Sequence, residues 1–78
     1  MYDPAKYKDG AKVRICPRSE LEEFLRTWKL HNKLRPEQIE YGGTSATVEK
    51  SFMYHGGYVL YQLNGIPGIW HEQLLRPA

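Results

Sequence analysis

The part of the sequence that decides the fold is residues 58–70, which read YVLYQLNGIPGIW. The run from Tyr58 to Leu63 is rich in β-branched and aromatic residues, and Asn64-Gly65 after it is a strong signal for a two-residue turn. Residues 66–70 return as a second strand, in which Pro67 predicts an edge position or a bulge because proline cannot donate a ladder hydrogen bond. This stretch therefore predicts a β-hairpin.

The residues before this hairpin predict another strand. Between residues 45 and 52 apolar and polar side chains alternate, so that Ala46, Val48 and Phe52 are expected to point one way. Lys50 interrupts this apolar face, which favours a bulge or an edge position near it. The run His55-Gly56-Gly57 predicts the connecting turn, since glycine adopts positive φ at little cost.

The N-terminal half predicts a strand followed by a helical insertion. Residues 11–16 alternate in the manner of a half-buried strand, and Pro17 ends it. Ser19 and Glu22 have the spacing of a capping box, Glu22 pairs with Arg26 at i,i+4, and a helix is expected over residues 19–31. Its apolar face is Leu21, Phe24, Leu25 and Trp28. A second helical piece starts at Arg35-Pro36 and ends at Gly42-Gly43.

These elements predict one small domain that is mainly β. Residues 71–74 look like a single helical turn and residues 75–77 like a closing strand. Five short strands are too few for two sheets and are expected to curl into one small barrel. The expected organisation is a single domain over residues 1–78, with an N-terminal arm at 1–9 and an insertion at 17–43 whose helical part is about 19–41.

Composition excludes several classes of protein. The 78 residues carry a net charge of only +2, which is low for a dedicated nucleic-acid clamp. The longest apolar run is too short for a membrane span or a signal-peptide core, so no membrane partner is expected. The single cysteine, Cys16, cannot form an internal disulfide, which favours a cytoplasmic location.

Several short motifs resemble those of the small SH3-like barrel proteins that occur in bacteria, phages, plasmids and integron gene cassettes. They are Gly10-x-Lys12-Val13-Arg14-Ile15, Ala46-Thr47-Val48, Tyr61-x-Leu63, Trp70-His71-Glu72 and Leu75-x-Pro77. The resemblance covers residues 10–77 and implies a five-stranded SH3-like barrel, with the helical insertion in place of the first long loop. It also implies an origin on a mobile genetic element, and it implies no particular chemistry.

Two better-known groups with this barrel differ from the chain at decisive positions. Signalling SH3 domains bind proline-rich peptides through an Ala-Leu-Tyr-Asp-Tyr segment in the first loop, which here carries the helix instead. Type II dihydrofolate reductases share an active site between subunits and carry Val-Gln-Ile-Tyr where this chain has Val59-Leu60-Tyr61-Gln62. Neither function is transferred on the fold alone.

No pattern in the sequence points to a metal, a cofactor or a catalytic centre. His71-Glu72 begins like a zinc-protease helix, but Leu75 stands where the second histidine is needed. The soft ligands Cys16, His31, His55 and His71 do not form a paired motif, and Cys16 has no histidine near it in sequence. We therefore expect no metal, no cofactor and no enzymatic activity.

The aromatic residues favour a binding or adaptor module. The strand 58–63 is apolar on both faces, so its second face is covered by the helix, by a second copy of the chain, or by a ligand or peptide. This predicts a self-associating module with an aromatic binding surface. The candidate binding residues are Tyr54, Tyr58, Leu60, Trp70 and His71.

Two alternatives use other residues. A nucleic-acid-binding accessory protein would use the basic N-terminal residues Lys6, Lys8, Lys12, Arg14 and Arg18. A small enzyme with an active site shared between subunits would use His55, Tyr61, His71 and Glu72 for acid–base chemistry.

Overall fold

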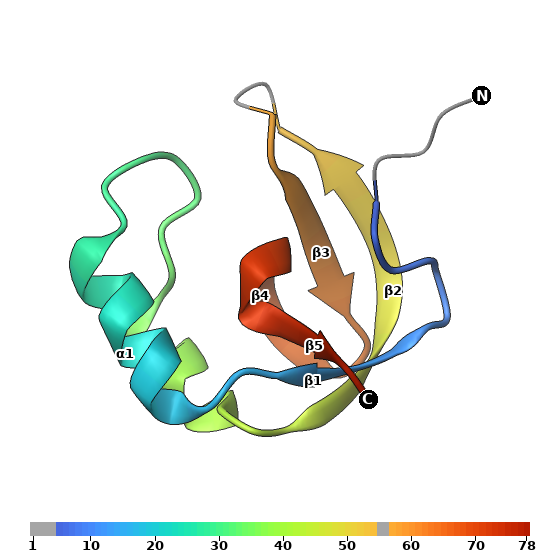
Figure 1. Ribbon diagram of the computed structural model, residues 1–78, viewed down its shortest axis with the longest axis horizontal. Helices are drawn as coiled ribbons and strands as arrows, with labels where there is room; N and C mark the ends of the chain where they lie inside the picture. The colour runs from blue at the N-terminus through green and yellow to red at the C-terminus, as the bar shows by residue number, and fades with distance from the viewer. Residues whose placement is uncertain (1–4, 55–56) are drawn as a thin grey trace.

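The computed structural model describes residues 5–54 and 57–78 (Figure 1). Within them lie one α-helix, α1 (Arg18–Thr27), and two short 3₁₀ helices, η1 (Pro36–Tyr41) and η2 (Glu72–Leu74). Five strands complete the described fold: β1 (Lys12–Ile15), β2 (Ser45–Met53), β3 (Val59–Leu63), β4 (Ile66–His71) and β5 (Leu75–Pro77). The fold is therefore mainly β with a helical insertion after the first strand, as the sequence predicts.

The strands form an antiparallel sheet in the order β4-β3-β2-β1-β5. The long strand β2 pairs with β1 near its start and with β3 near its end, so it joins the two halves of the sheet. The two-residue turn at Asn64-Gly65 is confirmed, with Leu63 opposite Ile66. Strand β4, which contains Pro67, lies at an edge as predicted. The hydrogen-bonded sheet is open, since β4 and β5 are its two ends.

A bulge in β2 confirms one prediction and corrects another. The register shifts by one residue between Val48 and Lys50, which is where the lysine interrupts the apolar face. Because the extra residue reverses the alternation of side chains, Lys50 points away from the core. The prediction that Phe52 shares the inward face of Val48 is therefore wrong. Phe52 lies on the outer face, opposite Leu60 of β3.

The core consists of the inward-facing side chains of the sheet together with buried side chains from α1 and η1. Val13 and Ile15 of β1 are fully buried, as the alternation of residues 11–16 predicts. They pack in one cluster with Tyr61, Trp70 and Leu21. The described fold is thus held by contacts between segments far apart in the sequence, which is typical of a small β-rich domain.

Helix α1 begins and ends differently from the prediction. Ser19 lies inside the helix, the N-cap is Pro17, and no side chain caps the first turn, so the predicted capping box is wrong. The helix stops at Thr27, because Trp28 is already extended. Arg26 pairs with Glu23 rather than Glu22. The predicted apolar face is confirmed at its buried members, Leu21 and Phe24.

The described part of the N-terminal segment packs against the sheet. Ala5 and Tyr7 are buried, and the Tyr7 hydroxyl donates a hydrogen bond of 3.3 Å to the carbonyl of Leu75. Ala5 and Tyr7 of the predicted N-terminal arm therefore belong to the core, whereas Lys6 between them is exposed. The predicted turn at His55-Gly56 lies outside the described residues, and Gly57 beside it has a φ of +93°.

Candidate functional site

A series of aromatic rings connects the loop after α1 with the tip of the β2–β3 hairpin. His31 lies against Tyr54 with ring centroids 5.2 Å apart, and Tyr54 stacks on Tyr58 at 5.4 Å. Trp28 then meets Tyr58 edge to face at 5.5 Å. Offset and edge-to-face ring pairs stabilise one another beyond the area that they bury. The loop and the hairpin tip are therefore held together by rings from both.

The same series of rings extends from the loop to the outer face of the sheet, the face opposite to the one that carries Tyr61 and Trp70. Phe24 and Trp28 stack at 4.9 Å, and both rings contact His71 of β4, at 4.9 and 4.8 Å. On this face Leu60 lies between Phe52 and His71 in the strand register and is buried. Side chains of the helical insertion thus lie over the second apolar face of β3, which is one of the three coverings that the sequence left open.

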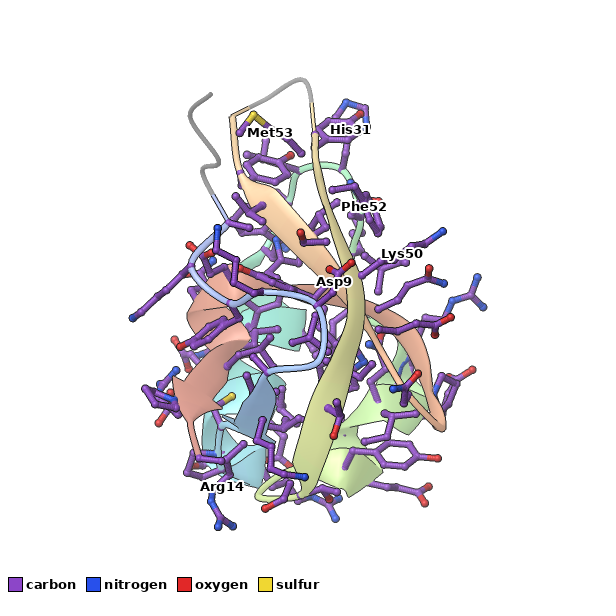
Figure 2. The ribbon with its side chains drawn as sticks, turned by 90° about the vertical axis from the view of Figure 1, so that its right-hand side faces the viewer. Asp9, Arg14, His31, Lys50, Phe52 and Met53 are labelled. Carbon is purple, nitrogen blue, oxygen red and sulfur yellow. The ribbon has the colours of Figure 1, made fainter. Side chains whose placement is uncertain are left out.

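Large apolar side chains remain exposed beside these rings. Leu30 is 57% exposed and Phe52 is 38% exposed, and Met53 on the other side of β2 is 53% exposed. Figure 2 shows His31, Phe52 and Met53 at the same end of the molecule, with Arg14 at the opposite end. We call the following set the aromatic surface: Trp28, Leu30, His31, Phe52, Tyr54 and Tyr58.

The structure places only part of the predicted binding residues on this surface. Tyr54 and Tyr58 are half-buried members of it. Leu60, Trp70 and His71 are buried, and Trp70 lies on the inner face of the sheet opposite Tyr61, so these three side chains offer no contact area to a partner. The sequence did not single out the other four members of the aromatic surface as binding residues: Trp28, Leu30, His31 and Phe52. Leu30 and His31 were expected inside a helix over residues 19–31, which the structure ends at Thr27.

The imidazole of His71 is held neutral by its surroundings. Its Nε2–H donates a hydrogen bond of 2.8 Å to the carbonyl of Asn32, and three aromatic rings surround it: Phe24, Trp28 and Tyr58. Burial lowers the pKa of His71 below 6.5, and the hydrogen bond to Asn32 opposes this only in part. A neutral, enclosed imidazole serves to pack the insertion on the sheet.

This environment predicts a pH-dependent stability. The unfolded chain takes up a proton near pH 6.5, whereas the folded chain does so only at lower pH. Stability is therefore complete above pH 6.5 and falls as the pH decreases, by up to about 1.4 kcal/mol per pH unit until the folded pKa is reached. Urea unfolding at several pH values measures this. His71→Phe should lose the effect and His31→Gln should keep it; equal pH profiles for both variants would refute it.

A second polar group lies where the N-terminal segment meets the sheet. The Tyr61 hydroxyl donates to Glu72 Oε2 at 2.5 Å and accepts a 3.1 Å hydrogen bond from the amide of Tyr7. The amide of Lys6 donates to the same carboxylate oxygen at 2.9 Å. Burial, and then the hydrogen bond to Glu72, raise the pKa of Tyr61 to about 12. The Tyr61 hydroxyl and the Glu72 carboxylate therefore anchor the backbone of residues 6 and 7 to the sheet.

The other residues considered for chemistry are dispersed. Cys16 is fully buried, and burial raises the pKa of its thiol. In the part of the chain that the structure describes, no three histidine, cysteine, aspartate or glutamate side chains gather as metal ligands would. His55 of the proposed acid–base set lies outside the described residues, while Tyr61, His71 and Glu72 have the hydrogen bonds given above.

The basic residues of the nucleic-acid alternative do not form one group. Lys12 and Arg14 point outward from β1, opposite Thr47 and Ser45, and Arg14 donates to the carbonyl of Gly43. Arg18 is paired with Glu22. Lys6 and Lys8 are exposed on the N-terminal segment. The structure therefore distributes these five cations over three elements.

Comparisons with protein-family models, with curated proteins and with solved structures found no match. Over residues 5–54 and 57–78, no helix has both the length and the apolar character needed to cross a membrane.

Proposed function

We propose that this chain is a non-catalytic binding module built on an SH3-like barrel, and that it acts through the aromatic surface. The strand order supports the proposed barrel. In addition, β2 is shared between the two halves of the sheet, and the 3₁₀ helix η2 directly precedes the closing strand β5. The helical insertion lies between β1 and β2, where the resemblance implies the first long loop.

The observation that carries the proposal is the exposure of Leu30 and Phe52 beside a set of rings that are already packed. Tyr54 and Tyr58 are fixed by stacking on one another, so they lose little side-chain freedom when a partner binds. Exposed apolar side chains that adjoin fixed aromatic rings are typical of protein interfaces. We propose no catalytic role because the side chains of Cys16 and His71 are buried and do not face a substrate.

We further propose that a second copy of the chain is one partner. Leu30 and Met53 are the most exposed large apolar side chains at the hairpin end, and a second copy offers the same pair in return. The cost of leaving them in water is removed when two such ends meet. The interface proposed here is the tip of the molecule, formed by the loop at residues 29–31 and the end of β2.

Light scattering over micromolar to millimolar concentrations tests this proposal. The mass should rise above the 9.1 kDa of one chain, equally at low and high salt because the contact is apolar. Leu30→Ser combined with Met53→Ser should restore the mass of one chain. Arg14→Ser, at the opposite end of the molecule, should leave the mass unchanged and serves as the control. A mass of one chain throughout would reject self-association.

A further inference from the structure

A hollow with several polar side chains in its wall begins at Asn32, the residue that follows His31 of the aromatic surface. It lies between residues 32–38 and the β3–β4 hairpin and has a volume of about 470 Å³. Hollows of this size accommodate a small ligand or one unit of a larger one. The polar side chains that line it come from the loop, from η1 and from β3: Asn32, Lys33, Arg35, Glu37, Gln38 and Gln62.

The cations in and beside this hollow have no carboxylate partner in the described part of the chain. Neither Lys33, Arg35 nor Lys50 forms an ion pair with any residue in the ranges 5–54 and 57–78. Three other arginines, by contrast, are each neutralised by a glutamate, in the pairs Arg18–Glu22, Arg26–Glu23 and Arg76–Glu20. The unpaired positive charge on this side of the molecule is therefore available to an anion.

The strand register brings Lys50 and Phe52 to the same place. Lys50 is directly opposite Gln62, which lines the hollow, and Phe52 follows two residues further along the same face of β2. Successive residues on one face of a strand are about 7 Å apart. Figure 2 shows Lys50 and Phe52 on one side of β2 and Met53 on the other. Lys50 thus lies beside the hollow, across from Gln62, and the exposed ring of Phe52 follows it on the same face of β2.

The wall of the hollow that carries Arg35 is fixed to the sheet. Gln38 is buried; its Nε2 donates to the carbonyl of Ile69 at 3.1 Å, and its Oε1 accepts from the amide of Arg35 at 2.8 Å. Gly68 makes this contact possible, because a Cβ there would lie 2.6 Å from Gln38 Nε2. The backbone that carries the cation is therefore placed before any ligand arrives, which lowers the cost of binding.

Glu37 also lines the hollow and opposes an anion. Its charge reduces the two cations of the lining to a net +1, and Lys50 beside Gln62 brings the total to +2. The ligand should accordingly be an anion that makes few ionic contacts and gains the rest of its affinity from ring stacking and hydrogen bonds.

We propose that the hollow and Phe52 together bind a single-stranded nucleic acid. Lys33, Arg35 and Lys50 contact its phosphates, a base stacks on Phe52, and the amide of Gln62 bonds a base edge. Cationic grooves that contain exposed aromatic rings bind single strands in this way. An acidic peptide would satisfy the cations but would leave Phe52 without a planar partner. The inference rests on the proposed function, because Phe52 belongs to the aromatic surface.

Fluorescence anisotropy with a labelled oligothymidylate of about ten nucleotides tests the inference. The oligonucleotide should bind, and the affinity should fall as salt is raised. Lys33→Gln and Arg35→Gln should each reduce the slope of log K against log salt by about 0.7. Phe52→Ala should raise Kd about fivefold or more, the effect of losing one stacked base. Glu37→Gln should lower Kd, because it removes the opposing charge.

The matched control is the double variant Lys12→Gln with Arg14→Gln, which removes two exposed cations from β1 and should leave Kd unchanged. The inference is overturned if the control weakens binding more than Arg35→Gln does, or if Phe52→Ala has no effect. It is also overturned if a duplex or a polyglutamate peptide binds as tightly as the single strand. If no oligonucleotide binds while light scattering shows association, the inference fails and the proposed function stands.

Discussion

Replacing Trp70 with alanine should lower the free energy of unfolding by about 3–5 kcal/mol, the usual cost of truncating a buried tryptophan. The indole is fully buried on the inner face of the sheet and lies in the core cluster with Tyr61, its partner in the register. A chain of 78 residues is expected to have a total stability of only roughly 4–12 kcal/mol. The loss is therefore a large share of the total stability, and the midpoint of unfolding in urea should fall markedly.

This expectation is tested by comparing the free energies of unfolding of Trp70→Ala and Trp28→Ala in urea. The two variants remove the same side chain from a buried and from a half-buried position. Trp28 is half-buried and contacts rings on the aromatic surface, so its loss should cost less than half as much. A larger loss for Trp28→Ala would contradict the placement of Trp70 in the core. Trp70→Ala also cannot probe partner binding, since any loss of binding would follow from loss of the fold.

Replacing Gly42 with alanine should destabilise the chain by about 2–3 kcal/mol or more, the upper range for overpacking. Gly42 has an ordinary φ of −55°, so the cause is steric and not conformational. A Cβ at this position would lie 2.6 Å from the backbone nitrogen of Arg18 and 2.7 Å from its Cα. Backbone atoms at the start of α1 cannot rotate away, so helix and η1 would have to separate.

The adjacent residue provides the matched control. Gly43 has a φ of +81°, and a Cβ there would meet no heavy atom within 4 Å. Gly43→Ala should therefore cost only the backbone strain of a left-handed residue, about 1–2 kcal/mol. Measured by unfolding in urea, Gly42→Ala should therefore lose more stability than Gly43→Ala. A greater loss for Gly43→Ala would contradict the close approach of η1 to α1.

Local patterns in the sequence predict most of the elements. Strand β3 and the turn at Asn64-Gly65 are confirmed because strand propensity and turn chemistry agree there. The bulge near Lys50 is confirmed because a charged residue cannot remain on an inward face. The outward position of Phe52 does not follow from the sequence. Which face a residue takes after a bulge depends on which residue is the extra one, and the sequence does not give this.

Local sequence patterns do not predict contacts between residues that are far apart in the sequence. The burial of Tyr7 depends on Leu75, 68 residues away, and nothing near Tyr7 signals this contact. The sequence alone does not separate a core position from a surface position for Trp70, because aromatic residues suit both cores and interfaces. The aromatic surface itself joins a loop to a hairpin tip, so its members could be found only after the insertion had been placed on the sheet.

Two ¹H–¹⁵N NMR titrations, one of increasing protein concentration and one of added oligothymidylate, would locate the binding surface of this chain. We expect the shift changes to gather at residues 28–35, 50–54 and 57–62, and the signals of β1 and β5 to stay unchanged. Changes centred on Lys12, Arg14 and Arg76, or no change in either titration, would contradict the claim that the aromatic surface is where this chain binds.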